Sequence, residues 1–193
     1  EQKILVATLK GVFGCPDMAG HVYGGDDPEP ICAEAILDAK QLLGDASGAL
    51  HTIIMHSAAY TQLQKNDLIA NIMPSQSGAF STYLGYNVIV DDFVQYDEND
   101  GLYSAYLLAD GVIGRGDGNP VDFTHTEAFR DGLRGEDILI HRKALILHPM
   151  GVKYIGAVGE DVSPTNAELA NPANWARVSS RKNVRMIEIK HTL

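Results

Sequence analysis

Apolar residues recur at helical spacing in the first quarter of the chain. Cys32, Ala35, Ile36, Ala39, Leu42 and Leu43 fall at i, i+3, i+4, i+7, i+10 and i+11. This spacing places them on one face of an amphipathic helix, and the glycine that follows them can end it. The apolar run 3–12 predicts the end of an earlier helix that stops near Gly11 and Gly14. The segment 14–30 between the two helices is rich in proline and glycine and predicts a loop.

The pattern then changes to short apolar runs. Thr52–Met55 predicts a strand, and Ser57 predicts the N-cap of a helix through about Lys65, because its hydroxyl can accept an orphan backbone N–H. The segment 68–73 predicts one or two further helical turns. The Ser/Gly-rich segment 75–82 predicts a mobile loop.

The second half of the chain is dominated by strand patterns. Strands are expected at 87–90, 103–108, 137–147 (one or two) and 184–189, with turns at 97–101 and 114–120 and a late helix near 167–170. β-branched and aromatic residues carry these strands, and Gly, Asp and Asn carry the turns. Helices first and strands afterwards indicate an α+β fold rather than a regular βαβ series.

Composition limits the classes of function. The 193 residues suit one domain or two small ones, and 45% hydrophobic with 21% charged residues is typical of a globular protein. No apolar run approaches the roughly 20 residues of a membrane-spanning helix. The formal net charge of −10 disfavours sequence-specific DNA binding, because phosphate contacts need a basic face. A basic cluster near the end (Arg177, Arg181, Lys182, Arg185) is more typical of a solvated surface.

The cysteines and the first residues give two further indications. Cys15 and Cys32 form no CxxC pair and cannot build a disulfide framework, which favours free thiols in a reducing compartment. The chain begins with Glu1 and opens directly on a helical pattern, which favours a protein shortened at its N-terminus.

Two groups of residues resemble metal sites but lack the required spacing. His51 and His56 are five residues apart, which on a strand places them on opposite faces. An EF-hand loop starting at Asp97 and passing through Asn99 and Asp100 would have Gly101 at position 5 and Leu108 at position 12, where oxygen ligands are needed. We therefore expect no metal and no cofactor.

Candidate catalytic and adhesive motifs are equally weak. Asp91 and Asp92 end an apolar strand, and Asp92 could join His125 or His141 in a hydrolase triad, but no GxSxG elbow supplies a nucleophile. The tripeptide 115–117 (Arg-Gly-Asp) lies among glycines and predicts a tight turn rather than an adhesion site. Trp175 is expected to anchor a loop or helix, with its N–H on a backbone acceptor. No catalytic residue is assigned.

Several blocks occur in an order that resembles a known family. They are IIMHSAAYTQLQKNDLI (53–69), TYLGYNVIVDD (82–92), YSAYLLADGVIG (103–114), LHPMGVKYIG (147–156), SPTNAELANPANWARV (163–178) and KNVRMIEIKH (182–191). Together they resemble the major capsid proteins of tailed bacteriophages and prophages. The LHPMG, SPTNAEL and NWARV blocks are the most specific, and the resemblance covers most of residues 31–193.

This resemblance implies the tailed-phage capsid fold, which is shared with encapsulins. Residues 1–29 would be the end of a spine helix and a linker, 30–108 and 149–193 the axial domain, and 109–148 the strands of the peripheral domain. The N-terminal arm, the extended loop and most of the spine helix would precede residue 1. The segment 75–82 and the tip of the axial domain would meet at the centre of a capsomer.

The implied function is structural. Copies of the subunit would assemble into hexamers and pentamers of an icosahedral shell around DNA, with scaffold and portal proteins as possible partners. The protein would lie in the virion, and in the bacterial host cytoplasm during assembly. Two alternatives stay open, namely an encapsulin-like compartment with a protein cargo and a soluble Asp/His hydrolase using Asp92. The neighbouring genes would distinguish an encapsulin-like compartment from a phage capsid. A panel of hydrolase substrates would test the hydrolase alternative.

Overall fold

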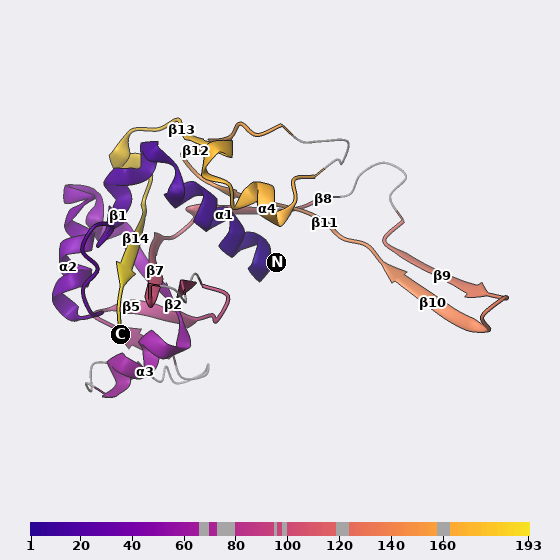
Figure 1. Cartoon of the computed structure of the whole chain (residues 1–193), viewed down its shortest axis with the longest axis horizontal. Helices are drawn as coiled ribbons and strands as arrows, with labels where there is room; N and C mark the ends of the chain where they lie inside the picture. Colours follow the sequence, from indigo (N-terminus) through magenta and orange to yellow (C-terminus); the bar gives the residue numbers. More distant parts are fainter. Residues whose placement is uncertain (66–69, 73–79, 95, 98–99, 119–123, 158–162) are drawn as a thin grey trace.

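A mixed β-sheet forms the centre of the molecule (Figure 1). The computed structural model describes residues 1–65, 70–72, 80–94, 96–97, 100–118, 124–157 and 163–193. Within them the sheet has eight strands in the order β1-β14-β7-β2-β5-β4-β3, and β6 pairs with β7 outside this path. β7 (Leu102–Ala109) pairs antiparallel with both β14 (Met186–His191) and β2 (Leu50–Met55), whereas β2 pairs parallel with β5 (Tyr86–Val90). The last strand of the chain therefore lies inside the sheet, between β1 and β7.

The other elements surround this sheet or extend from it. The helices are α1 (Gln2–Gly14), α2 (Ala33–Gln41), α3 (Ser57–Lys65) and α4 (Asn166–Leu169), with short 3-10 turns at Pro16–His21, Gly44–Ala49, Pro172–Asn174 and Arg181–Asn183. The other strands are β1 (Val22–Tyr23), β3 (Ala70–Ile72), β4 (Phe80–Tyr83), β6 (Tyr96–Asp97), β8 (Ile113–Gly118), β9 (Thr126–Asp131), β10 (Glu136–His141), β11 (Ala144–Pro149), β12 (Val152–Tyr154) and β13 (Trp175–Arg177).

Each face of the sheet has its own apolar core, because successive side chains on a strand point to opposite faces. On one face, α2 and α3 contribute Ile36 and Leu63, which join Leu107 and Ile187 from the central strands. On the other face, α1 and the C-terminal segment cover side chains from the same strands. This second core contains Val12, Phe13, Ile54, Tyr106, Trp175 and Met186. The architecture is α+β, as the order of the patterns predicts.

A two-part β-ribbon leaves the sheet after β7. β8 pairs antiparallel with β11, and further along the chain β9 pairs antiparallel with β10. Figure 1 shows the β9–β10 hairpin projecting far from the helices and the sheet. The base of the ribbon is fixed to α1, because Glu1 accepts hydrogen bonds from Lys143 (2.6 Å) and Arg115 (3.3 Å). Hydrogen bonds from these two cations lower the pKa of Glu1 to about 2.

Most of the expected elements are confirmed. The helix with its apolar face at Ala35, Ile36 and Ala39 is α2, with Cys32 as its N-cap. The strands expected at 52–55, 87–90 and 103–108 are β2, β5 and β7. The region 137–147 contains β10 and most of β11, the late helix is α4, and the last strand is β14, two residues later than expected.

Four expectations are wrong in part. The segment 14–30 contains a 3-10 turn and β1, which pairs with β14. Residues 70–72 form β3, and residues 80–82 belong to β4, so the expected helical turn and loop are replaced there by strands. The remainder of those two expectations lies outside the described residues. Residues 114–118 form β8 rather than a turn, because pairing with β11 outweighs the low strand propensity of glycine.

His21 is a buried polar residue between the 3-10 turn and β14. Its side chain is fully buried, and its Nδ1–H donates to the backbone oxygen of Met186 at 3.1 Å. Desolvation, together with the positive charges of Arg181 and Arg177, lowers the pKa of His21 to about 4. The imidazole is therefore neutral in the folded protein at neutral pH.

This depressed pKa predicts a pH dependence of stability. Below about pH 6.5 the unfolded imidazole gains a proton that the folded one does not accept until about pH 4, so stability falls as the pH drops through this window. When the pH is lowered from 7.5 to 5, the free energy of unfolding should decrease in both proteins. We expect this decrease to be roughly 1–2 kcal/mol smaller in His21→Gln than in the wild type. Denaturant titrations at both pH values measure this. His51→Gln, at an exposed position, is the control, and an unchanged pH dependence of His21→Gln would contradict the assignment.

Candidate functional site

The two aspartates after β5 bind backbone groups. Asp91 Oδ1 accepts the N–H of Phe93 at 2.9 Å, and Asp92 Oδ1 accepts the N–H of Ser57 at 3.2 Å. Hydrogen bonds from Ser57 lower the pKa of the Asp92 carboxyl. The structure therefore joins Asp92 to the start of α3.

Asp92 lies near a histidine, but not near either of those considered from the sequence. His56 Nε2 is 3.8 Å from Asp92 Oδ1. His141 lies on the projecting β10 and contacts Thr126 there, and His125 precedes β9 on the same ribbon (Figure 1). The proposed pairing of Asp92 with either ribbon histidine is therefore wrong.

The group of Ser57, His56 and Asp92 has the wrong hydrogen bonds for a catalytic triad. A triad histidine uses one ring nitrogen to accept the nucleophile's proton and the other to contact the carboxylate. Here His56 Nδ1 accepts the N–H of Ala58 at 3.1 Å, and Nε2 faces Asp92. Both carboxylate and imidazole thus satisfy the first N–H groups of α3, which corrects the expectation that Ser57 itself is the N-cap. The arrangement stabilises a helix end.

The other sequence candidates also have structural roles. Arg115 Nη1 and Asp117 Oδ2 form an ion pair at 3.1 Å within β8, so the tripeptide 115–117 is part of a strand. Trp175 Nε1–H donates to the Leu169 oxygen at 2.7 Å, which confirms the expected backbone acceptor. Cys15 Sγ–H donates to the Trp175 oxygen at 3.1 Å. Among the described residues, no cluster of three or more His, Cys, Asp or Glu could hold a metal ion.

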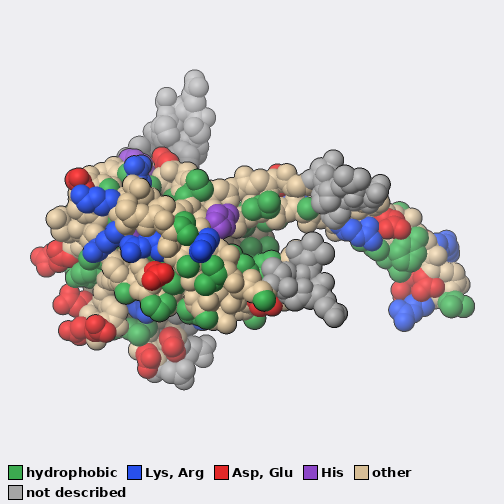
Figure 2. Space-filling view, turned by 90° about the horizontal axis from the view of Figure 1, so that it is seen from above, with side chains coloured by type: hydrophobic (Ala, Val, Ile, Leu, Met, Phe, Trp, Pro, Cys, Tyr) green, Lys and Arg blue, Asp and Glu red, His purple; other side chains and the backbone are tan. Residues whose placement is uncertain are grey.

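No helix in the described part of the chain is long and apolar enough to cross a membrane. The basic residues near the C-terminus, among them Arg181, lie at the surface, and Lys182 forms an ion pair with Asp45 at 2.7 Å. Figure 2 shows Lys and Arg side chains gathered over part of the globular body. An ion pair of this kind fits the solvated surface that the sequence favours.

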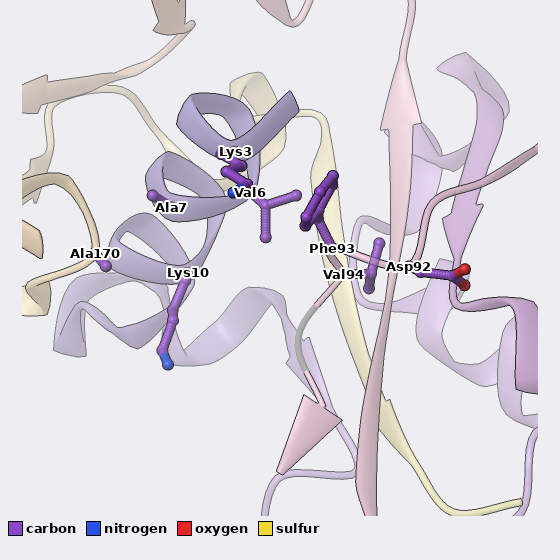
Figure 3. Close-up of a pocket in the computed structure, with 8 residues that line it drawn as sticks. All are labelled: Lys3, Val6, Ala7, Lys10, Asp92, Phe93, Val94 and Ala170. Carbon is purple, nitrogen blue, oxygen red and sulfur yellow. The ribbon is translucent and has the colours of Figure 1, made fainter. Parts of the chain in front are cut away.

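A shallow groove lies between α1 and the segment after β5 (Figure 3). It has a volume of about 420 Å³, and its lining includes Val6, Ala7, Phe93, Val94 and Ala170. Lys3 and Lys10 lie along it on α1, and Lys3 Nζ is 5.2 Å from the centre of the Phe93 ring. In Figure 3 the Asp92 carboxylate points away from α1, so two ammonium groups and an apolar floor dominate the groove.

The β9–β10 hairpin carries apolar side chains that the fold does not bury. Leu133 at its tip is 101% exposed, Leu139 is 71% exposed and Phe129 is 47% exposed. Phe129 pairs with Ile138, whereas Leu139 pairs with Ala128, so apolar side chains lie on both faces of the hairpin. Figure 2 shows hydrophobic side chains along the projecting ribbon.

Neither the groove nor the hairpin surface was identified from the sequence. The apolar run 138–140 indicates a strand, but not that the strand leaves the body. The groove depends on Phe93, which follows β5, lying beside α1, a contact between segments far apart in the sequence. The segment 75–82 is expected to contact other subunits at the capsomer centre. Its residues 75–79 lie outside the described residues, and its residues 80–82 belong to β4.

Two comparisons with known proteins match major capsid proteins. A family model described as "Major capsid protein 13-like" (Gp13-like) matches residues 6–184. The major capsid protein of Bacillus phage SPP1 is 40% identical over 198 residues, which cover 100% of this chain and 60% of that protein. A cryo-EM structure of the holo-SrpI encapsulin complex from Synechococcus elongatus PCC 7942 aligns with a TM-score of 0.47 and 12% identity, over 90% of this chain and 53% of that one. The chain thus spans about 60% of the length of its curated relative.

Proposed function

The chain belongs to the Gp13-like family of major capsid proteins, and on this premise we propose that it is the shell-forming part of a bacteriophage capsid subunit. Copies of the whole protein assemble into hexamers and pentamers that close an icosahedral shell around DNA. The subunit acts by binding its own copies and catalyses no reaction. It resides in the virion and, during assembly, in the host cytoplasm, where scaffold and portal proteins are its further partners.

The observation that carries this proposal is the β9–β10 hairpin. An isolated two-stranded hairpin is at best marginally stable in water, and this one exposes Phe129, Leu133 and Leu139. Apolar side chains on a projecting element favour burial against another chain, which offsets the cost of ordering the hairpin. In a subunit that binds its own copies, such a hairpin would be buried against a neighbouring subunit.

The architecture supports a division of roles within the subunit. The sheet, whose strands other than β1 come from 30–108 and 149–193, serves as the axial domain near the centre of each capsomer. The ribbon within 109–148 serves as part of the peripheral domain. Residues 1–29 connect the two, since α1 lies on the sheet and Glu1 binds the base of the ribbon. Many such contacts per subunit, each of modest strength, add up to a durable shell.

The experiment targets the exposed hairpin side chains. The complete gene that contains this sequence is expressed with Phe129→Ser and Leu139→Ser together, and the fraction of protein that sediments as particles is measured. We expect particles to decrease by about tenfold or more, because two apolar contacts per subunit are lost at every interface. The unfolding midpoint should change little, since neither side chain belongs to a core cluster.

The matched control is Leu37→Ser. Leu37 is 51% exposed on α2, on the globular body rather than on the ribbon. This variant should form particles at the wild-type level. Normal assembly of the hairpin variant, or an equal loss in the control, would contradict the assigned role of the hairpin.

A further inference from the structure

The α1 groove carries unpaired positive charge beside an apolar floor. Lys3 and Lys10 are two helical turns apart, or about 10 Å along the axis of α1, with Val6 between them on the same face. Within the described residues neither lysine has a carboxylate partner. Phe93 is 50% exposed and forms one wall, with its ring beneath Lys3 (Figure 3). The groove therefore fits a segment that presents an apolar side chain next to carboxylates.

The tip of the β9–β10 hairpin has these properties. Residues 126–141 contain four carboxylates against two arginines. At the tip, the fully exposed Leu133 is followed by Arg134, whose charge is offset by Asp131 at 4.0 Å, and then by Glu136 and Asp137. Asp137 contacts Arg130 only loosely, at 3.9 Å and on an exposed surface, and Glu136 has no ion-pair partner among the described residues. Charge and apolar character thus complement those of the groove.

The hairpin does not lie in the groove of its own chain. Figure 1 shows β9 and β10 directed away from the body, whereas the groove lies between α1 and the segment after β5. We propose that the hairpin tip of one copy docks in the α1 groove of a second copy, with Leu133 on Phe93 and Val6 and with the Glu136 and Asp137 carboxylates toward Lys3 and Lys10.

This contact deepens the proposed function and rests on it, because it names two surfaces through which the copies meet. The surfaces differ, so the contact is heterologous and each copy offers one hairpin and one groove. Repetition of a heterologous contact generates a ring when the rotation closes. Complementary charge selects this pairing over hairpin against hairpin, since like charges repel.

Charge reversal tests the pairing in the complete gene product. A groove variant carries Lys3→Glu with Lys10→Glu, and a hairpin variant carries Glu136→Lys with Asp137→Lys. Each alone should associate about tenfold less than the wild type in sedimentation velocity, because groove and hairpin then repel. An equimolar mixture of the two should recover association. The basic hairpin of the hairpin variant binds the acidic groove of the groove variant, and the unchanged acidic hairpin of the groove variant binds the unchanged basic groove of the hairpin variant. A chain with all four changes should also recover it.

The control reverses two exposed lysines elsewhere, Lys65→Glu with Lys153→Glu, and should associate like the wild type. This contact alone would be overturned if the groove variant and the hairpin variant each associated as strongly as the wild type. It would also be overturned if neither the mixture nor the chain with all four changes recovered association. Failure of the wild type itself to associate would overturn the proposed function as well. The two failures are therefore distinguishable.

A covalent trap gives a second measurement. Chains with Val6→Cys are mixed with chains with Leu133→Cys, both in a Cys32→Ser background, and exposed to mild oxidation. We expect a disulfide-linked heterodimer as the main cross-linked product. Leu133→Cys mixed with Lys153→Cys is the matched control, and equal cross-linking in the two mixtures would overturn the assignment of the groove.

Discussion

Replacing Gly11 with alanine is expected to lower the free energy of unfolding by roughly 2–4 kcal/mol, since the added methyl group overpacks a core and strains a buried hydrogen bond. A Cβ at this position would lie 2.0 Å from the Leu169 oxygen and 2.6 Å from Trp175 Nε1. These two atoms form the bond that fixes the indole to α4. The backbone oxygen cannot rotate away as a flexible side chain would, so α1 must move from the C-terminal segment.

Gly48→Ala is the matched control for this experiment. Gly48 lies in the 3-10 turn Gly44–Ala49, and a Cβ there would meet no atom within 4 Å. Urea titrations of both variants give the comparison. Equal stability of the Gly11 and Gly48 variants would show that the close contact between α1 and Trp175 is not present in solution.

The second large effect is expected at Leu107. Its side chain is fully buried at the centre of β7, between β2 and β14 and under the helices of the first core. Truncation to alanine removes buried methyl groups and leaves a cavity in a close-packed region, which costs about 2–5 kcal/mol. Chemical denaturation monitored by the single tryptophan measures the loss.

Leu139→Ala makes the same chemical change on the projecting hairpin. Because Leu139 is 71% exposed, the free energy of unfolding should change by no more than about 0.5 kcal/mol. A large loss of stability in Leu139→Ala would mean that the hairpin packs on its own body. A small loss in Leu107→Ala would contradict the central position of β7.

The elements that the sequence predicted well are those in which local preference and burial agree. α2 has its apolar residues at helical spacing and uses Cys32 as its N-cap, and β2 buries Ile53 and Met55 on one face and Ile54 on the other. Only a segment that buries these faces can fold stably, so periodicity alone identifies it. The fold class follows from the order of such segments.

The elements that the sequence mispredicted depend on partners far along the chain. The glycines of 114–118 favour a turn locally, but β11, about 30 residues later, supplies hydrogen bonds that hold them extended. In the same way, Asp92 and His56 rather than Ser57 serve the first N–H groups of α3. No local pattern contains such information.

The blocks that indicated the family have clear structural roles. In SPTNAEL, Thr165 and Glu168 form a reciprocal capping box at the start of α4. In LHPMG, Gly151 has a φ of +85°, and a Cβ there would lie 2.8 Å from Val184. In NWARV, Trp175 belongs to the second core. The resemblance therefore rests on residues that this packing requires, whereas the exposed hairpin and groove depend on three-dimensional placement.

Electron microscopy of the complete gene product tests whether copies of this subunit form a shell. The gene that contains this sequence is expressed whole, and the purified product is imaged in negative stain. We expect regular closed shells or capsomer rings. Dispersed monomers, even when the other assembly proteins of the phage are supplied, would contradict this expectation.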